Sequence, residues 1–257
     1  MKFTQAITRK PSESYLHGIT TAELGLPDLE LALKQHTRYC QALEQAGVQV
    51  EILPALEAYP DSVFVEDTAI VEPEFAILSR PGAISRRGEA AEILPVLEEQ
   101  FERVYQIEGN ATLDGGDICK ADDIYYIGLS ARTNLEGAQQ LASILNYYGY
   151  RSELIDIRRL QGILHLKSAV NYLGEDTLLL DPRLATQWPF SGYRQLVVPL
   201  EEAYAANCLR INEILLVPSG FLYTLELVTN AGFDALLLDV SEYRKMDGGL
   251  SCLSLRW

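Results

Sequence analysis

The chain has 257 residues, 48% of them hydrophobic, and a formal net charge of −15 at pH 7. This length and composition are sufficient for one large domain with a substantial core. A charge of this sign repels a phosphate backbone, and the sequence contains no basic stripe interleaved with aromatic residues, so nucleic acid is not an expected partner.

The N-terminal segment, residues 1–11, lacks the apolar stretch of a signal peptide, and no run of residues reaches the length of a membrane span. We therefore expect a cytoplasmic protein that does not contact a membrane. The four cysteines are far apart and form no C-x-x-C pair, which argues against a zinc knuckle and a dithiol redox motif. Reduced thiols in a cytosol fit this pattern.

The first periodic segment predicts a helix over residues 27–47, because Leu29, Ala32 and Leu43 belong to an apolar stripe at helical spacing. Pro27 and Gly47 mark its start and stop. Similar periodicity predicts helices over residues 88–101, 133–149 and 221–232. A further helical segment is expected near residues 183–195, although it contains a proline and a glycine.

Short runs typical of strands lie between these helices. They cover residues 48–53, 62–65, 75–79, 124–127, 152–157, 177–180, 214–217 and 235–240. The alternation of the two patterns predicts an α/β protein.

Polar or titratable residues recur in five short segments spaced roughly 40 to 50 residues apart, a period typical of repeated structural units. The segments are residues 64–67, 112–117, 163–167, 205–208 and 250–253. If each unit contributes one inner strand to a ring, the five strand ends converge on one axial pocket. That pocket would hold Glu66, Asp67, Asp114, Asp117, His165 and Cys252. The alternative is five unrelated polar strand ends, because the units share little sequence similarity.

Cys252 is the candidate nucleophile. Gly248, Gly249 and Ser251 leave open backbone beside its sulfur, whereas a cysteine in a core strand is normally flanked by bulky side chains. The alternative is a small buried hydrophobic residue near the end of the chain.

His165 is the candidate base, because the other two histidines lie on a helix stripe and in a glycine-containing loop. A histidine in an apolar run is also a common core residue. Asp114 and Asp117 flank two glycines, which suits either a hairpin turn or a carboxylate that projects into a pocket. Glu66 and Asp67 are adjacent, so a regular strand would point only one of them inward.

Arg86 and Arg132 each lie near the start of a predicted helix, where positive charge opposes the helix dipole. Such a position is mildly unfavourable, so a functional purpose is worth considering. Both guanidinium groups are suited to bidentate binding of a carboxylate. Solvated surface arginines are the alternative.

Six motifs together give the chain a resemblance to the dimethylarginine dimethylaminohydrolase family of guanidine-modifying enzymes. They are Phe64-Val-Glu-Asp, Leu113-Asp-Gly-Gly-Asp, Ser130-Ala-Arg-Thr-Asn, Leu164-His-Leu-Lys, Ala205-Ala-Asn-Cys and Asp247-Gly-Gly-Leu-Ser-Cys. Each motif is weak alone, but the similarity keeps their order over nearly the whole chain. The resemblance implies a five-bladed α/β propeller, the pentein fold, with pseudo-fivefold symmetry, a central active site and a single catalytic domain over residues 1–257.

The resemblance also implies residue roles. Cys252 matches the nucleophile, His165 the general acid/base, and Asp114 the carboxylate that orients the histidine. Eight residues match substrate-binding positions: Ile19, Asp61, Glu66, Asp67, Arg86, Arg132, Met246 and Ser251. Glu66 and Asp67 would hold the guanidinium group and the two arginines the α-carboxylate, while Ile19 lies on a loop that covers the site. The family varies between aspartate and glutamate at position 114 and usually has leucine at position 19.

The implied reaction converts N-methylated arginines to citrulline and a methylamine through a covalent thiouronium intermediate, without metal or cofactor. A guanidinium carbon is a poor electrophile, so the reaction needs a thiolate and carboxylates that hold the guanidinium plane. His165 would protonate the departing amine and then activate water. The neighbouring acids disfavour a resting thiolate, so we expect the bound guanidinium to favour ionisation of Cys252.

Three other functions fit parts of the sequence. An arginine or agmatine deiminase uses the same residue types on the same bond. A non-catalytic propeller that binds a partner needs the fold but not Cys252, His165 and Asp114 together. A zinc hydrolase is the third, although the spacing resembles no known zinc site. A homodimer is expected by resemblance alone.

Overall fold

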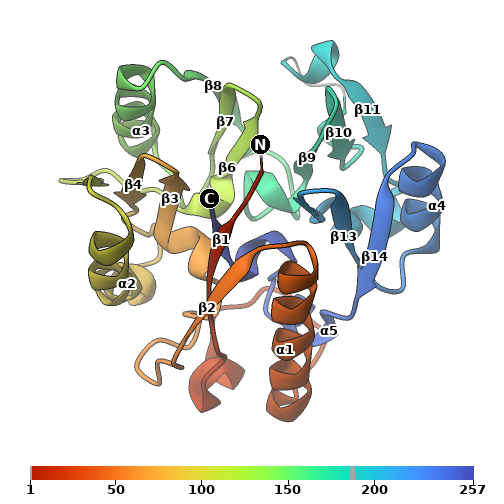
Figure 1. The fold of residues 1–257 in the computed structure, drawn as a ribbon, viewed down its shortest axis with the longest axis horizontal. Helices are drawn as coiled ribbons and strands as arrows, with labels where there is room; N and C mark the ends of the chain where they lie inside the picture. The colour runs from red at the N-terminus through yellow and green to blue at the C-terminus, as the bar shows by residue number, and fades with distance from the viewer. Residues whose placement is uncertain (1, 186–188) are drawn as a thin grey trace.

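Five three-stranded sheets, arranged like blades around a central axis, make up the described structure, a computed structural model that covers residues 2–185 and 189–257 (Figure 1). The strands are β1 (Gln5–Arg9), β2 (Gln49–Leu53), β3 (Ala69–Glu72), β4 (Phe75–Leu78), β5 (Val104–Gln106), β6 (Ile118–Ala121), β7 (Ile124–Leu129), β8 (Arg151–Asp156), β9 (Val170–Gly174), β10 (Thr177–Leu180), β11 (Arg194–Val197), β12 (Leu209–Ile211), β13 (Ile214–Pro218), β14 (Asp234–Leu238) and β15 (Leu255–Arg256). The helices are α1 (Leu29–Gln45), α2 (Arg87–Gln100), α3 (Leu135–Tyr147), α4 (Leu222–Asn230) and α5 (Ser241–Arg244).

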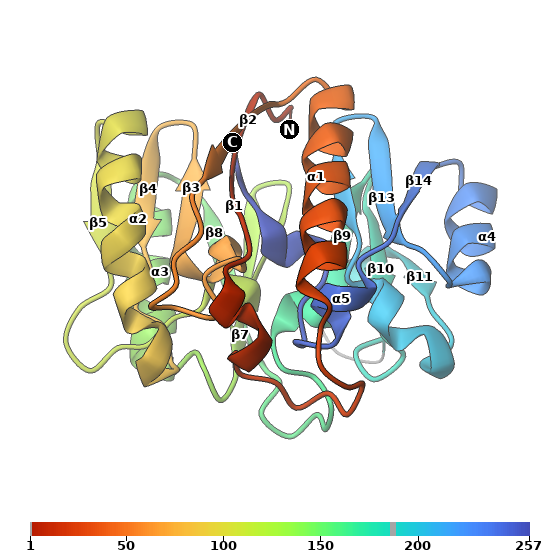
Figure 2. The same ribbon diagram turned by 90° about the horizontal axis from the view of Figure 1, so that it is seen from below.

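Every blade repeats one pattern. An inner strand pairs antiparallel with a middle strand, and the middle strand pairs parallel with an outer strand, as in the sheet β3-β4-β5. Parallel neighbours require a crossover connection. In four blades this connection contains a helix, α1 to α4 in turn, and these helices lie on the outside of the ring (Figures 1 and 2). The pattern makes the chain a five-bladed α/β propeller.

The two ends of the chain close the ring. The C-terminal strand β15 is the inner strand of a blade whose middle and outer strands are β1 and β2. Ala6 pairs with Arg256 and Ile7 with Leu255. The first and last blade segments are therefore tied together, and the Cys252 segment, just before β15, is brought to the axis.

Side-chain caps fix where two of the helices begin. The Asp28 carboxylate accepts a hydrogen bond from the Leu31 amide at 3.0 Å, and the Asn134 side chain accepts one from the Gly137 amide at 2.8 Å. Such caps satisfy amides that have no partner inside the helix. They explain why α1 and α3 start two residues later than the apolar pattern predicts.

The structure confirms the four main helices and seven of the eight predicted strands, with ends shifted by at most two residues. The strand predicted at residues 62–65 is wrong. A turn and the 3-10 helix η2 (Val65–Thr68) occupy this region, and β3 begins only at Ala69. Glu66 and Asp67 are both buried, which a 3-10 turn permits and a regular strand does not.

The helix expected near residues 183–195 is also wrong where the structure describes this segment. Residues 182–185 form a turn, the 3-10 helix η6 covers Phe190–Gly192, and β11 starts at Arg194. Residues 186–188 of the expected helix lie outside the described residues.

The five polar segments converge on the axis, but as 3-10 turns rather than as strand ends. They are η2, η4 (Gly115–Asp117), η5 (Leu166–Ser168), η7 (Leu200–Ala206) and η8 (Ser251–Leu253), and each precedes the inner strand of a blade. η2 contacts both η8 and η4, η4 contacts η5, and η5 contacts η7. Their side chains therefore meet at one end of the ring.

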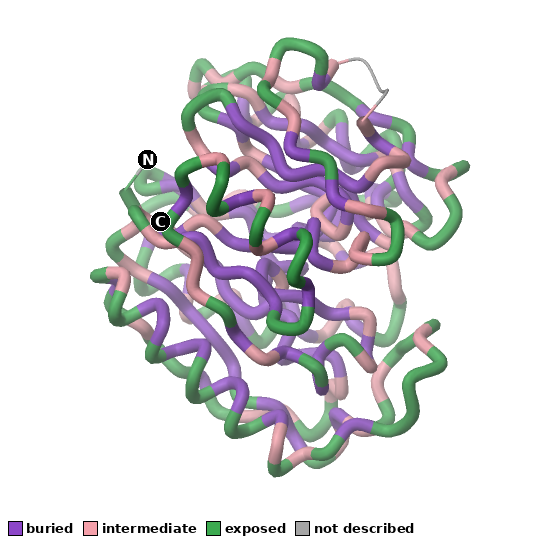
Figure 3. Tube along the Cα trace, turned by 90° about the vertical axis from the view of Figure 1, so that its right-hand side faces the viewer, coloured by how far each residue is buried: buried purple, intermediate pink, exposed green. Residues whose placement is uncertain are grey.

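The buried apolar side chains fall into five clusters, one between each pair of neighbouring blades. One cluster joins Phe75 and Ile77 of β4 to Ile127 of β7 and to Leu141 and Leu145 of α3. Figure 3 shows the buried trace running through the strands, with exposed residues mostly on outer helices and loops. Within the described residues, no helix combines the length and apolarity needed to cross a membrane.

Candidate active site

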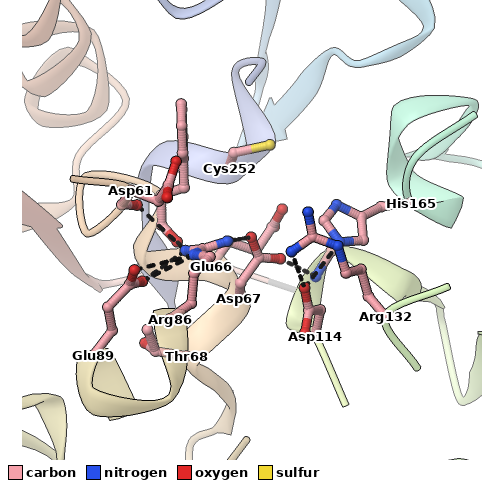
Figure 4. Close-up of polar contacts among 12 residues, drawn as sticks. Asp61, Glu66, Asp67, Thr68, Arg86, Glu89, Asp114, Arg132, His165 and Cys252 are labelled. Atoms are coloured by element: carbon pink, nitrogen blue, oxygen red, sulfur yellow. Dashed lines mark hydrogen bonds and ion pairs between the residues drawn. The ribbon is translucent and has the colours of Figure 1, made fainter. Parts of the chain in front are cut away.

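A small pocket of about 30 Å³ lies where the turns η2, η5 and η8 approach each other. Eight of the residues predicted for the site line it: Ile19, Asp61, Asp67, Arg86, Arg132, His165, Met246 and Cys252. Figure 4 shows Asp67 between the Arg86 guanidinium and the side chains of His165 and Arg132. The structure thus brings a thiol, an imidazole, carboxylates and guanidinium groups from distant parts of the sequence together.

Cys252 is held in the turn η8 and is partly exposed, as its small neighbours predict. Its Sγ accepts hydrogen bonds from the Gly249 amide at 3.4 Å and from Asn207 Nδ2 at 3.7 Å. Burial, together with the carboxylates of Glu66 and Asp67, raises the pKa of the Cys252 thiol to about 12. The two hydrogen bonds offset this only in part, so the resting group is a thiol.

His165 is buried, and its Nε2 lies 3.1 Å from Asp114 Oδ2. Burial alone lowers the pKa of His165, but Asp67, the hydrogen bond to Asp114, and Asp117 outweigh it and raise this pKa to about 9. At neutral pH the ring is therefore an imidazolium that donates to Asp114. Asp114 is itself fully buried behind the histidine, and its Oδ1 accepts from the Gly82 amide at 2.8 Å.

Asp67 carries negative charge into the pocket. Its Oδ2 lies 2.5 Å from Arg86 Nη1, and its Oδ1 accepts from the Gly116 amide at 2.9 Å. Burial would raise the pKa of Asp67, but the charges of His165 and Arg86 and the hydrogen bonds lower it to about 2. A carboxylate that stays ionised beside a thiol is suited to binding a planar cation.

The two arginines differ in how many of their N–H groups are free. Arg86 is buried and donates to both oxygens of Glu89, to Asp67, and to the backbone carbonyls of Asp61 and Phe64. Arg132, by contrast, makes one side-chain polar contact among the described residues, an ion pair with Asp114 at 4.0 Å. Arg132 therefore has more donors available for an anionic ligand.

The segment around Ile19 covers the pocket. The Ile19 amide donates to Asp61 Oδ1 at 2.9 Å, and the Thr21 amide and hydroxyl both donate to Asp247 Oδ2, at 2.5 and 2.9 Å. Burial raises the pKa of Asp61. Met246 is buried on the same side. These polar contacts, rather than apolar packing, keep the covering segment in place.

Glu66 and Ser251 do not line this pocket. The Glu66 carboxylate pairs with Lys167 and with Arg256 Nη2, the latter at 3.0 Å, and accepts from Ser251 Oγ at 2.9 Å. Glu66, Lys167 and Arg256 instead line a separate cavity of about 480 Å³. That cavity is the larger one, but its lining lacks Cys252 and His165, so the chemistry is assigned to the small pocket.

Sequence reasoning missed four residues that support the site. Asn207 contacts both Cys252 Sγ and the Ser251 amide, Glu89 binds Arg86, Lys167 binds Glu66, and Gly82 binds Asp114. Asn207 belongs to a recognised motif, and this was the available signal. The other three act through partners distant in sequence.

The chain is similar to several known proteins. The family model for eukaryotic N,N dimethylarginine dimethylhydrolase matches residues 26–182. The N(G),N(G)-dimethylarginine dimethylaminohydrolases of Pseudomonas aeruginosa and Streptomyces coelicolor are 41% and 36% identical, over 99% and 100% of this chain and 100% and 98% of theirs. A solved structure of a mutant of the Pseudomonas aeruginosa protein complexed with citrulline matches with a TM-score of 0.97 and 40% identity over 100% of both chains.

Alkylation of Cys252 by iodoacetamide in the ligand-free protein is expected to be slow at pH 7. It should accelerate by about tenfold per pH unit, because only the thiolate reacts and the thiol pKa is raised. Mass spectrometry of the labelled peptide measures the rate, and Cys252→Ser is the control for labelling at other cysteines. A rate that levels off below pH 8 would contradict the buried-thiol assignment.

Replacement of Glu66 by glutamine is expected to destabilise the fold, because Lys167 and Arg256 would keep their charge without a buried partner. The expected loss in free energy of unfolding is about 3–5 kcal/mol. Urea denaturation followed by circular dichroism measures it. Asp123→Asn, which breaks the exposed pair with Arg151, is the matched control and should leave the midpoint unchanged. Equal midpoints for both variants would show that the Glu66 cluster is not stabilising.

Proposed function

The chain belongs to the dimethylarginine dimethylaminohydrolase family, and from this premise we propose that it hydrolyses N-methylated L-arginines to L-citrulline and a methylamine. One observation supports the proposal most directly. Cys252, His165 and the ionised Asp67 line a single pocket, and Asp114 lies directly behind the histidine. A nucleophile, a charged acid and an anchor for a cation are the groups that this reaction needs.

In the proposed complex, Asp67 binds the substrate guanidinium and Arg132 binds its α-carboxylate. Asp67 already binds one guanidinium group, that of Arg86, through a single oxygen. Arg86 therefore orients Asp67 more than it contacts the substrate, since most of its own N–H groups are engaged. Glu66 supports the Cys252 turn from behind through Ser251 rather than binding the guanidinium.

In the first half-reaction, the Cys252 thiol releases its proton to solvent, and the resulting thiolate adds to the guanidinium carbon. His165, protonated at rest, donates a proton to the methylated nitrogen, so that the C–N bond breaks and a neutral amine departs. The carbon remains bound to sulfur as a thiouronium cation, which Asp67 stabilises by charge. Asp114 keeps the imidazole oriented throughout.

In the second half-reaction, the now neutral His165 removes a proton from water, and the hydroxide adds to the thiouronium carbon. The C–S bond then breaks and sulfur leaves with its electron pair. The added hydroxyl group passes its remaining proton to the departing thiolate, which leaves the neutral urea group of citrulline and restores the Cys252 thiol. The proton that His165 took from water restores the imidazolium. The cycle returns both groups to their starting protonation states.

The substrate itself is proposed to generate the thiolate. Burial and two neighbouring carboxylates raise the pKa of the Cys252 thiol to about 12, and a bound guanidinium would neutralise part of the field of these carboxylates. Because the pocket encloses only about 30 Å³, the segment around Ile19 must move before a substrate of this size can enter.

We further propose a cytoplasmic location, one catalytic domain over residues 1–257 and a homodimer. All four cysteines are free, which suits a reducing compartment. Pairing of β1 with β15 joins the N-terminal and C-terminal segments in one blade, which suits a single cooperative unit.

Citrulline formation by the purified protein is expected with asymmetric dimethylarginine and monomethylarginine and is expected to vanish in Cys252→Ser. Parallel assays with arginine and agmatine test the deiminase alternative. Preference for either of these would reassign the substrate. A lack of turnover with all four, together with unreactive Cys252, would favour a binding propeller.

Gly116→Ala is expected to reduce kcat/KM by about a hundredfold, because a displacement of catalytic groups by about 1 Å has an effect of this size. An added Cβ would lie 2.8 Å from Asp67 Oδ1 and 3.0 Å from the His165 ring, so one of them must shift. Gly192→Ala is the control, because no atom of the described residues lies within 4 Å of its added Cβ. Steady-state kinetics measures both, and equal activity would show that the Gly116 contact is not limiting.

A further inference from the structure

Asp117 is a fully buried carboxylate at the end of η4 that does not line the Cys252 pocket. Each of its oxygens accepts one hydrogen bond from a different part of the chain. Oδ1 accepts from the Leu166 amide at 3.0 Å, and Oδ2 accepts from Ser130 Oγ at 2.6 Å. A buried carboxylate is costly unless donors compensate it, so this residue connects two segments that no backbone ladder joins.

The first segment carries the proposed acid/base. Leu166 directly follows His165, so the amide that donates to Asp117 belongs to the peptide bond between these two residues. Space around this contact is tight, because a Cβ added at Gly128 would lie 3.1 Å from Asp117 Oδ1 and 2.9 Å from Leu166 Cβ. The Asp117 contact therefore fixes the backbone from which His165 reaches Asp114.

The second segment carries the proposed carboxylate-binding arginine. Ser130 Oγ donates to Asp117 and accepts from the amides of Arg132 and Thr133 at 2.9 and 3.1 Å. Thr133 Oγ1 in turn accepts from the Asp114 amide at 3.1 Å. One chain of hydrogen bonds thus runs from Asp117 through the Ser130 turn to Arg132 and back to Asp114.

The carboxylate form is specifically suited to this arrangement. Both groups that face Asp117 are donors, and an asparagine offers one acceptor oxygen and one NH₂ donor in the same shape. Its NH₂ would face either the Leu166 amide or the Ser130 hydroxyl. The Ser130 hydroxyl can rotate to accept a hydrogen bond from this NH₂, but it then no longer donates one. The Leu166 amide is only a donor, so it cannot pair with the NH₂.

We propose that Asp117 is a positioning residue that keeps the His165 segment and the Arg132 turn in register around the substrate. The inference rests on the proposed function for the roles of His165 and Arg132. One oxygen governs the placement of the acid/base, and the other governs, through Ser130, the placement of the arginine.

Two variants separate the two arms of this arrangement, which are the hydrogen bond of Asp117 Oδ1 to the His165 segment and that of Asp117 Oδ2 to the Arg132 turn. Asp117→Asn is expected to lower kcat by about a hundredfold, because His165 is displaced, and also to raise KM. Ser130→Ala interrupts only the arm to the Arg132 turn, so KM should rise about tenfold while kcat stays within about threefold. Asp181→Asn is the matched control: Asp181 is also buried, but it binds Arg183 outside the pocket, and kcat and KM should not change.

A readout that does not depend on turnover is the NMR titration of the His165 ring, assigned by comparison with His165→Gln. The charged groups that face this ring are Asp67, Asp114 and Asp117, with Cys252 across the pocket and Arg86 and Arg132 beside the acids. Asp117→Asn should lower the His165 pKa, because one negative charge is removed and the contact to Asp114 loosens. Asp181→Asn should leave this pKa unchanged.

The outcomes distinguish the proposals. Wild-type kcat, KM and His165 titration in Asp117→Asn would overturn the positioning role. Loss of activity only in proportion to the unfolded fraction, with an unchanged His165 pKa, would also overturn it by making the residue merely structural. If Asp117→Asn does not fold, unchanged KM in Ser130→Ala overturns the arginine arm. If the wild type forms no citrulline, the proposed function fails, while the titration still decides the role of Asp117.

Discussion

Buried charges that must be paired are the constraint on which this structure depends. The turns that meet at the axis bring acids together in a place that water reaches poorly, and like charges at that distance repel strongly. Three of these acids are therefore matched with cations: Asp67 with Arg86, Asp114 with His165, and Glu66 with Lys167 and Arg256. The partners come from different blades or from different parts of one blade, so satisfying the charges also locks the blades in register.

Closure of the ring makes this pairing possible. β15 can join β1 only if the final segment crosses the axis, and this path carries η8 against η2. Ser251 then donates to Glu66, and Arg256 binds both that carboxylate and the Ser251 carbonyl. The Cys252 turn is fixed on its rear side by an ion cluster whose residues Glu66, Lys167 and Arg256 line the larger cavity. Chain connectivity and site geometry are consequences of one strand pairing.

The sequence predicted elements well where one periodic pattern decides the structure. Helices α1 to α4 follow from apolar spacing, and Cys252, His165 and Asp67 were identified and do meet in one pocket. Short inner strands such as β15, with two residues, are too brief for periodicity to reveal. The direction in which Glu66 points was not predictable either, because it depends on Lys167 and Arg256, which are 101 and 190 residues away. Local patterns identify candidate site residues, but contacts with residues distant in sequence decide where their side chains point.

In the proposed reaction, the balance of charge around Cys252 makes the pocket selective for cationic ligands. With Glu66 and Asp67 nearby, sulfur is held as a thiol, which reacts slowly with electrophiles and oxidants in general. A cation bound at Asp67 lowers the cost of ionising the thiol at the sulfur that forms the new bond, whereas a neutral ligand leaves this cost unchanged. In the proposed reaction the imidazolium of His165 serves the same event, because its proton passes to the leaving group of the cation that Asp67 holds. Reactivity thus depends on the charge of the ligand before it depends on the ligand's shape.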